Sequence, residues 1–312
     1  KVIKTVSAKT LWVKLVQNRV ETGEPYVMFK DTVQAALPQF QKDLGLQVHH
    51  SNLCSEITLA TTSERTAVCC LSSVNLEEYD EWKDNDQFIP DLVRMLDNVL
   101  DYFIENAPDE LYRAKLSAER ERSIGLGAMG FHAYLQRHNI PFESVLAKGA
   151  NNRMFTRIKT EAVRATKELA VERGECPDGV GSGVRNAHLL AVAPNASSSI
   201  ICGNTSPSIE PYRANAFTQK TKSGSSLLKN EYLEHALDEI DQNTDEVWKS
   251  IITNGGSCQH LDFLDDYTKD VFKTAVEIDQ KWIIELAGDR QKHICQSQSL
   301  NIFFPADVAK QE

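Results

Sequence analysis

The six residues 51–56, Ser-Asn-Leu-Cys-Ser-Glu, place a thiol between an amide and a carboxylate. In an extended segment, side chains two residues apart project from the same face. Asn52, Cys54 and Glu56 are therefore expected to stand side by side, with a hydrogen-bonding amide and a potential base flanking the sulfur. The alternative is that Cys54 only packs in a half-buried strand, because free cysteine is among the most buried residue types.

A second candidate site follows the apolar run Leu-Leu-Ala-Val-Ala at 189–193, which is typical of a buried strand. The next residues are small and rich in hydroxyls. Such a turn presents backbone N–H groups and hydroxyls at one point, which suits a phosphate without a lysine. The alternative is an ordinary serine-rich turn. The predicted phosphate-binding residues are Pro194, Asn195, Ala196, Ser197, Ser198 and Ser199.

Other motifs carry less weight. Residues 125–130, Gly-Leu-Gly-Ala-Met-Gly, match a dinucleotide-binding pattern that requires a preceding strand. The preceding residues are instead typical of a helix, so we predict helical glycines and no cofactor. His49, His50, Cys54 and the pair Cys69–Cys70 lack the two-pair spacing of a zinc site, and no metal site is predicted.

Composition limits the class of protein. The net charge is −10, without a dense run of Lys or Arg, which argues against nucleic acid as a main partner. No apolar run reaches the ~18–20 residues of a membrane span, and no secretory signal is present. Seven scattered cysteines do not fit a secreted disulfide framework, so we expect a cytoplasmic protein. A first residue of lysine indicates a fragment.

The hydrophobic pattern predicts the order of elements. A helix is expected over 7–23, with Leu11, Leu15 and Val16 inward and a stop at Gly23. Two strand-like pieces, 53–60 and 66–72, flank the turn 61–65. Further helices are expected over 88–106 (Leu92, Leu96, Val99 and Phe103 inward), 118–138 (Ile124, Ala128, Phe131 and Leu135 inward), 153–174 and 270–288, and strands over 189–193 and 297–304.

The alternation of strands and helices, without a repeat or a long linker, indicates a single α/β unit over 1–312.

The sequence resembles the large, catalytic subunit of ribonucleotide reductase. Five stretches carry the resemblance in the order of the family, and together they span nearly the whole chain. They are Asn-Leu-Cys-Ser-Glu at 52–56, the finger-loop motif, and the segments 67–76, 122–131, 194–212 and 295–308.

The resemblance implies a fold and a mechanism. The fold would be part of a ten-stranded α/β barrel, with the radical cysteine on an inner finger loop. Cys54 would carry a thiyl radical that abstracts the 3′-hydrogen, Glu56 would accept the 3′-hydroxyl proton, and Asn52 would hold the ribose hydroxyls. Cys69 would be half of the reducing dithiol, and residues 194–199 would anchor the nucleotide diphosphate.

The resemblance also implies partners. The expected substrates are ribonucleoside diphosphates, reduced to 2′-deoxyribonucleotides, with thioredoxin or glutaredoxin as reductant. The chain would bind no cofactor itself, because a separate metal-containing small (beta) subunit would supply the radical, and the full-length protein would be a homodimer.

The chain departs from the full family pattern at both ends. The ATP-cone, the first redox cysteine, the tyrosine pair and the C-terminal redox tail have no counterpart in the sequence. We therefore expect a partial barrel that is inactive alone, with the partner of Cys69 supplied from outside. Cys70, one residue on, is expected to point the opposite way from Cys69 in a strand and is left out of the site.

Two alternatives remain. An adenosylcobalamin-dependent reductase shares the thiyl chemistry, although the segment 295–308 is more similar to the class with a separate small subunit. The second alternative is a non-catalytic nucleotide-binding remnant or split subunit. The intact Asn52, Cys54 and Glu56 argue against it.

Overall fold

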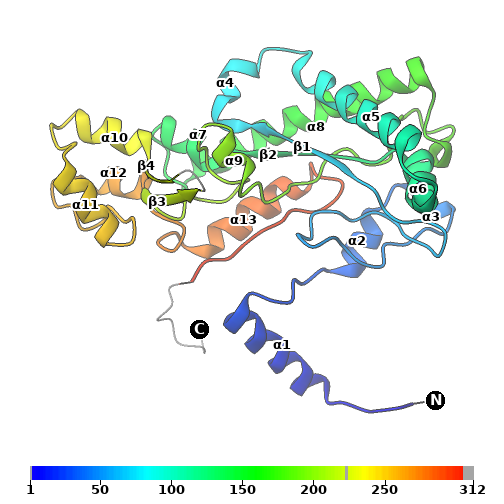
Figure 1. Cartoon of the computed structure of the whole chain (residues 1–312), viewed down its shortest axis with the longest axis horizontal. Helices are drawn as coiled ribbons and strands as arrows, with labels where there is room; N and C mark the ends of the chain where they lie inside the picture. The colour runs from blue at the N-terminus through cyan, green and yellow to red at the C-terminus, as the bar shows by residue number, and fades with distance from the viewer. Residues whose placement is uncertain (1, 222–223, 305–312) are drawn as a thin grey trace.

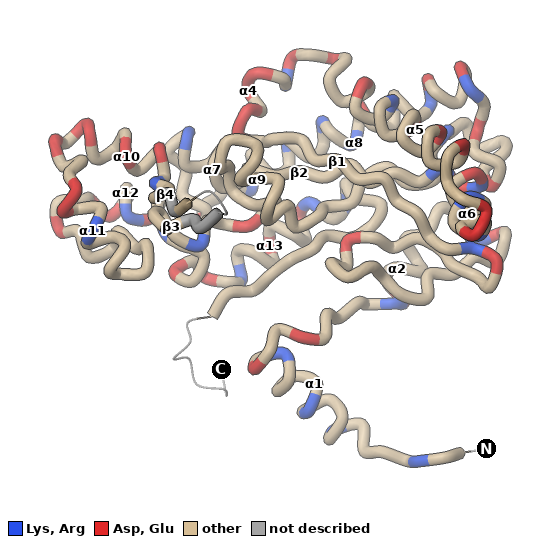
Figure 2. Tube along the Cα trace, viewed as in Figure 1, with Lys and Arg blue, Asp and Glu red and all other residues tan. Residues whose placement is uncertain are grey.

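The computed structural model describes residues 2–221 and 224–304. Figure 1 shows an elongated body from which the N-terminal helix stands apart. Lys and Arg positions are dispersed among acidic ones along the chain (Figure 2). Among the described residues, no helix is both long and apolar enough to cross a bilayer.

The centre of the fold is a layer of parallel, extended segments. β1 (Cys70–Asn75) pairs in parallel with β2 (Ile124–Met129), with Cys70 opposite Ile124. Parallel single bridges extend the layer from Leu126 to Leu190 and from Val192 to Gln298. The described residues thus form an open parallel layer, whereas the closed sheet of a barrel is not formed by them.

Helices precede this layer and cover it. α5 (Phe88–Asn106) is the longest helix of the crossover from β1 to β2 that a parallel pair requires, and α8 (Val145–Arg173) packs against both α5 and α13 (Gln280–Gln291). The other helices up to residue 201 are α1 (Ala8–Thr22), which stands apart from the body, α2 (Lys30–Ala36), α3 (Gln39–Asp43), α4 (Tyr79–Trp82), α6 (Tyr112–Glu121), α7 (Phe131–Arg137) and α9 (Ser198–Ile201), with short 3-10 turns η1 (Leu76–Glu78), η2 (Asp109–Leu111) and η3 (Pro177–Gly179).

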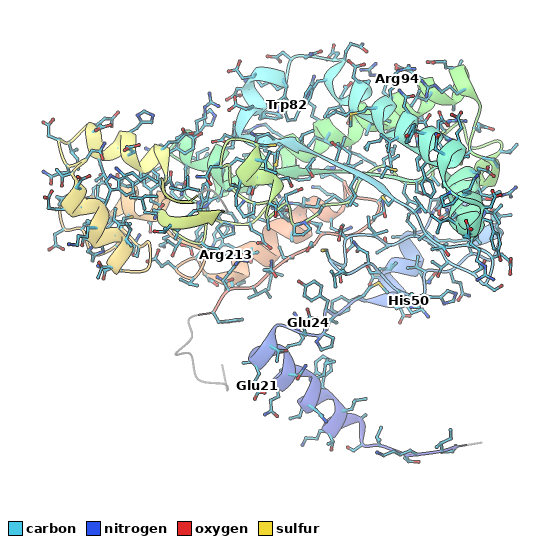
Figure 3. The ribbon with its side chains drawn as sticks, viewed as in Figure 1. Glu21, Glu24, His50, Trp82, Arg94 and Arg213 are labelled. Atoms are coloured by element: carbon cyan, nitrogen blue, oxygen red, sulfur yellow. The ribbon has the colours of Figure 1, made fainter. Side chains whose placement is uncertain are left out.

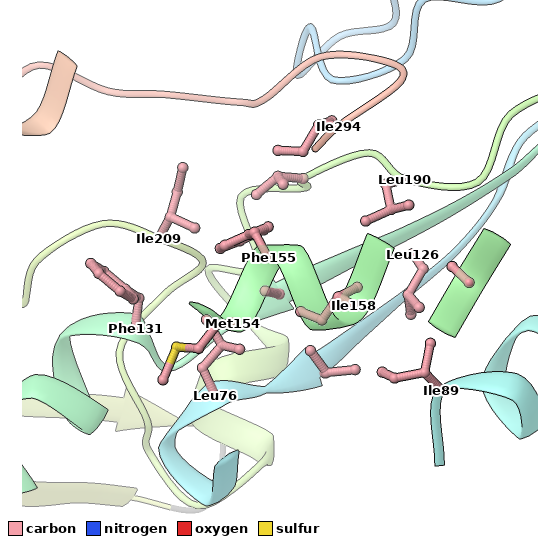
Figure 4. Packing of buried hydrophobic residues seen from close by; sticks show 14 of the residues in the cluster. Leu76, Ile89, Leu126, Phe131, Met154, Phe155, Ile158, Leu190, Ile209 and Ile294 are labelled. Atoms are coloured by element: carbon pink, nitrogen blue, oxygen red, sulfur yellow. The ribbon is translucent and has the colours of Figure 1, made fainter. Parts of the chain in front are cut away.

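The two faces of the layer are covered differently. The helical face holds the main core, in which Leu126 and Leu190 meet Phe155 and Ile158 of α8 (Figure 4). Each such side chain contributes about 1.5–3 kcal/mol when fully buried. The opposite face carries a small cluster of Ile57, Leu59 and Ala191, against which Ala67 and Cys69 pack.

This division separates the two adjacent cysteines. Cys69 packs with the small cluster, whereas Cys70 packs against the main core. Neighbouring residues of an extended chain face opposite sides. The prediction that Cys70 points away from Cys69 is confirmed.

A satellite unit lies at the end of the body opposite α6 (Figure 1). The antiparallel hairpin of β3 (Ala216–Thr221) and β4 (Gly224–Lys229) precedes three helices, α10 (Glu231–Asp238), α11 (Asp245–Thr253) and α12 (Asp266–Val271). Trp248 and Leu233 are fully buried in its separate core. The sequence did not predict this hairpin.

The predicted helices over 7–23, 88–106 and 153–174 are confirmed as α1, α5 and the greater part of α8, and Gly23 and Gly174 are C-caps as expected. The prediction that α1 has an inward face is wrong, because none of its residues is buried and Leu11 is 60% exposed. In α5, Leu96 is buried as predicted, and Leu92 and Phe103 are partly buried against the main core, but Val99 is exposed. The fully buried residues of α5 are Ile89, Pro90, Val93, Leu96, Asp97 and Leu100.

The helix predicted over 118–138 is wrong. Arg122 takes a left-handed conformation (φ 47°) and ends α6, after which 124–129 form the fully buried strand β2. Neighbouring chain passes so close to two of its glycines that helical periodicity is overridden: a Cβ on Gly127 would lie 2.5 Å from the Ala191 carbonyl oxygen. The apolar residues repeat as a helix would require, but both faces of this strand are covered.

Other strand boundaries also differ. Residues 53–60 contain a turn and irregular chain rather than a strand, whereas β1 begins only at Cys70. The turn at 61–65 is confirmed by the bridge between Thr62 and Arg65. The segments 189–193 and 297–304 are extended but joined only by single bridges. The helix predicted over 270–288 is broken between α12 and α13, and α13 continues past Gly288.

A buried ionic cluster fastens α5 to the chain around β2. Asp97 of α5 is completely buried and contacts Arg122 (2.8 Å), Arg173 (3.0 Å) and Arg185 (3.4 Å). Burial opposes ionisation, but Arg122 and the other guanidinium groups outweigh it and hold the pKa of Asp97 below its usual range. The ionised carboxylate therefore contributes stability.

We predict that Asp97→Asn lowers the free energy of unfolding at pH 7 by about 3–5 kcal/mol, because it removes the buried carboxylate partner of three guanidinium groups and leaves them only the partly exposed Asp101 as a shared acidic partner in this cluster. The folded-state pKa of Asp97 is lowered, so its contribution is present above the unfolded pKa near 3.9 and is lost as pH falls through the folded value. Urea unfolding at pH 7 and pH 3 measures both effects. Asp86→Asn, which removes an exposed partner of Arg157, is the control and should cost under about 1 kcal/mol.

Candidate active site

The segment 51–56 forms a tight turn. The Ser55 N–H donates to the Asn52 carbonyl oxygen (3.1 Å), and Ser55 has a left-handed φ of 65°. The side-chain oxygen of Asn52 accepts the N–H of Ile57 (3.2 Å), which closes the turn at its base. The expectation of a shared strand face is therefore wrong, because Cys54 stands at a turn and not in an extended chain.

Burial increases steeply along this turn. Asn52 is exposed, Cys54 is half-buried and Glu56 is only 2% exposed. One carboxylate oxygen of Glu56, Oε2, has no hydrogen-bond partner in the part of the chain that the structure describes. A buried carboxylate oxygen without a partner is costly, and this oxygen is an acceptor that none of the described residues uses.

The Cys54 thiol is kept protonated. Burial, and then the nearby charge of Glu56, raise the pKa of Cys54 above its ordinary value. Nucleophilic cysteines instead have lowered pKa values and react as thiolates. This environment suits a cysteine that reacts through its S–H group.

A cavity of about 570 Å³ opens beside the turn, within the size range of small-molecule sites. It lies between the turn, the chain around 26–36 and the last extended segment. Cys54 and Ser55 line it, as do Thr58, Gln296 and Ser297. Of the predicted site residues only Cys54 lines it: Asn52, Glu56, Cys69 and residues 194–199 are not among the lining residues, so this cavity does not unite the predicted site.

Cys69 lies immediately before β1 with a free thiol. Its sulfur packs over Gly125, where an added Cβ would come within 2.9 Å of it. Burial raises the pKa of the Cys69 thiol far above its ordinary value, opposed by a hydrogen bond from Gln296. Gln296 also lines the cavity of Cys54, and it connects the two cysteine environments.

The predicted phosphate loop is anchored by Asn195. Its side-chain N–H groups donate to Ser73 Oγ (3.0 Å) and to the Ala193 and Ala128 carbonyl oxygens (3.1 and 3.2 Å). The Asn195 amide is thus used to hold the loop. The exposed residues 196–198 have backbone N–H groups that donate to no acceptor among the described residues, whereas Ser199 N–H donates to the Asn195 carbonyl.

The structure adds residues that the sequence did not identify. Ser297 N–H donates to the Glu56 carbonyl oxygen (2.9 Å), and Gln296 reaches the segment after the turn. The available signal was a run of polar residues, Gln-Ser-Gln-Ser at 296–299, which overlaps the start of the strand predicted over 297–304. Polar side chains in such a position need partners, but the sequence does not say which.

No group of three or more metal-ligating side chains occurs within residues 2–221 and 224–304. His49 and His50 are exposed, and Figure 3 shows His50 near α2. Gly125 and Gly127 lie within a strand, not in the turn between strand and helix where a dinucleotide motif binds pyrophosphate.

Residues 1–179 and 177–312 match the family described as ribonucleotide reductase, barrel domain. The chain belongs to this family.

Relatives and a solved structure agree with this assignment. The chain is 51% identical to the ribonucleoside-diphosphate reductase large subunit of Invertebrate iridescent virus 3 over 310 residues, which cover 98% of the chain and 49% of the relative. The chain is 33% identical to the ribonucleoside-diphosphate reductase large subunit of Caenorhabditis elegans, over 97% of the chain and 42% of the relative. The solved structure of the class Id ribonucleotide reductase alpha subunit of Actinobacillus ureae superposes with a TM-score of 0.91 at 43% identity. The match covers 97% of this chain and 56% of that subunit. The chain thus spans about half the length of these proteins.

We predict that Gly125→Ala lowers the free energy of unfolding by about 1–3 kcal/mol, because overpacking a closed core forces shifts. The new methyl group would lie 2.4 Å from Leu71 Cδ2 and 2.9 Å from the Cys69 sulfur. Gly149→Ala in α8 is the matched control. Its Cβ meets only Arg153 Nη1 at 3.4 Å, and alanine favours a helix, so stability should stay equal or rise. Equal urea midpoints for Gly125→Ala and the unmodified protein would contradict the close packing.

Proposed function

We propose that this chain carries the radical-cysteine part of a ribonucleotide reductase that converts ribonucleoside diphosphates to 2′-deoxyribonucleoside diphosphates. The observation that carries the proposal is a protonated thiol, Cys54, beside a cavity and two residues from a buried carboxylate, Glu56, with an unpartnered oxygen. Membership of the reductase family supports this reading.

The chemistry follows from the groups in this turn. Cys54, as a thiyl radical, abstracts the 3′-hydrogen of the ribose and becomes a thiol. Glu56 then accepts the 3′-hydroxyl proton through its free oxygen, which must lie within hydrogen-bond reach. Asn52, exposed at the start of the turn, holds the ribose hydroxyls. We also propose that the turn at 51–56 is the finger loop that lies inside the complete barrel.

The reduction requires two electrons and two protons. The 2′-hydroxyl leaves as water, and a dithiol that becomes a disulfide supplies the electrons and protons. Cys69 is one half of this dithiol, and the other half comes from outside the chain. Its strongly raised pKa keeps Cys69 in the thiol form that such a donor needs.

The nucleotide diphosphate is anchored by residues 194–199. Three consecutive residues, 196–198, present free backbone N–H groups at the surface, and the Asn195 side chain fixes their loop on β2. Converging N–H groups bind phosphate without a cation.

Partners follow from the class. The chain itself binds no cofactor, and a metal-containing small (beta) subunit supplies the radical, as similarity to a class Id alpha subunit supports. Thioredoxin or glutaredoxin renews the dithiol. The complete protein is a cytoplasmic homodimer, to which residues 1–312 contribute one catalytic unit.

The first test concerns Cys54. In a complete large subunit carrying residues 1–312, Cys54→Ser should reduce turnover at least about 1,000-fold, because an alcohol O–H is too strong to replace the S–H in hydrogen transfer. Nucleotide affinity should stay within about twofold. Turnover with the small subunit and an external dithiol, together with equilibrium binding, measures both.

Cys202→Ser is the matched control, since this exposed cysteine takes no part in the proposed chemistry and should leave turnover unchanged. Residual turnover of Cys54→Ser above a few per cent would remove Cys54 from the mechanism. Unaltered cobalamin-dependent turnover without a small subunit would favour the adenosylcobalamin class. Nucleotide binding without any turnover in the complete protein would favour a non-catalytic remnant.

The second test concerns the phosphates. A crystal structure with a ribonucleoside diphosphate should place the phosphate oxygens within about 3 Å of the N–H groups of Ala196, Ser197 and Ser198. Ser197→Pro removes one of these donors and should weaken binding of the diphosphate while sparing the nucleoside. Phosphates bound beside 125–130 would refute the assignment.

A further inference from the structure

Gln296 occupies the point where four segments of the site meet. It is only 4% exposed, yet it lines the cavity of Cys54. Its backbone N–H donates to the Leu190 carbonyl oxygen (3.1 Å), which ties it to the layer. Its side chain reaches the three other segments.

Each end of the Gln296 amide has its own partner. The oxygen Oε1 accepts the backbone N–H of Thr58 (3.3 Å), two residues beyond Glu56. The nitrogen Nε2 donates to the Ile124 carbonyl oxygen (3.0 Å) and to the Cys69 sulfur (3.9 Å). Only an amide offers an acceptor and two donors in this arrangement.

The neighbours of Gln296 keep its side chain on this face. Ser297 N–H donates to the Glu56 carbonyl oxygen (2.9 Å). Cys295 lies on the other face, in the main core, where its sulfur accepts the N–H groups of Leu189 and Leu190 (3.1 and 3.2 Å). The residues before and after Gln296 are therefore fastened independently.

We propose that Gln296 is a positioning residue that fixes the Cys69 sulfur relative to the turn carrying Cys54 and Glu56. This inference rests on the proposed function, in which Cys69 must reach the same substrate as Cys54. One rigid amide connects Cys69 to the base of the turn through Thr58, so the two thiols are held in a common frame. The same N–H group stabilises negative charge on the Cys69 sulfur when it gives up its proton.

The two ends of the amide can be tested separately in the chain itself. Gln296→Met removes donors and acceptor at similar volume, whereas Gln296→Glu keeps the acceptor but replaces the donors by a carboxylate. Alkylation of each cysteine is followed by peptide mass spectrometry between pH 7.5 and 10, and exchange of the Thr58 amide hydrogen is followed by NMR.

In both variants, alkylation of Cys69 should slow by roughly two- to tenfold at every pH, since a hydrogen bond to the thiolate is lost. Alkylation of Cys69 should be slower in the Gln296→Glu variant than in the Gln296→Met variant, because the added negative charge disfavours the thiolate. Exchange of the Thr58 amide should accelerate in the Met variant and stay protected in the Glu variant. Alkylation of Cys70, on the opposite face, should not change.

Gln298→Met is the matched control. Gln298 lines the same cavity, but its amide donates to the Ala287 carbonyl and to Gln291, with no bond to Cys69 or Thr58. It should leave both measurements unchanged.

Faster alkylation of Cys69 and Cys70 together, or equal Thr58 exchange in the Met and Glu variants, would overturn the proposal in favour of general loosening. Failure of both variants to fold would likewise assign Gln296 a purely structural role. None of these readouts depends on turnover. A failure here would leave the Cys54→Ser test standing, and an active Cys54→Ser enzyme would defeat the proposed function whatever Gln296 does.

Discussion

The candidate site depends on one constraint: the last extended segment must bind the central layer and the cysteine turn at the same time. Residues 296–298 bridge to 189–193 on one side, through the Gln296 and Val192 N–H groups among others, and Ser297 holds the Glu56 carbonyl on the other. The turn at 51–56 has no strand pairing of its own. Its position relative to Cys69 is therefore set by a segment more than two hundred residues away in the chain.

The two faces of the central layer differ in burial and polarity, and this difference decides which residues are placed to react with a ligand. The helical face is closed by α5, α8 and α13, and it provides most of the apolar burial that stabilises the fold. The opposite face holds a small apolar cluster, and buried polar groups that include Glu56, Thr58 and Gln296. Burial without closely placed cations raises the pKa of both Cys54 and Cys69. The face thus favours thiols over thiolates, which suits hydrogen transfer better than nucleophilic attack.

The sequence predicted the motifs and the long helices better than the geometry of the site. α5 and α8 follow from local periodicity, because their apolar stripes are continuous over many turns. The strand β2 could not be predicted from local periodicity. Its glycines are needed because Cys69 and Ala191, from other parts of the chain, lie too close to leave room for a side chain. The cysteine turn was missed for a similar reason: the left-handed Ser55 has no signature such as glycine or asparagine. Gln296 could be suspected from its polarity, but its three partners could be found only in the folded chain.

Two of the five buried side-chain polar atoms without a partner among the described residues, in Glu56 and Arg290, differ in their surroundings. Glu56 Oε2 is buried without a hydrogen-bond partner among the described residues, two residues after Cys54, which lines the large cavity. Arg290 Nη2 is also without a partner among the described residues, but its guanidinium lies over the rings of Phe131 and Phe155 (5.4 and 5.5 Å) and donates to Asn151. Those contacts compensate part of the desolvation that lowers the pKa of Arg290 to about 9. Among the described residues Glu56 forms no ion pair, and a ligand that donates a hydrogen bond would relieve the cost of its unsatisfied acceptor.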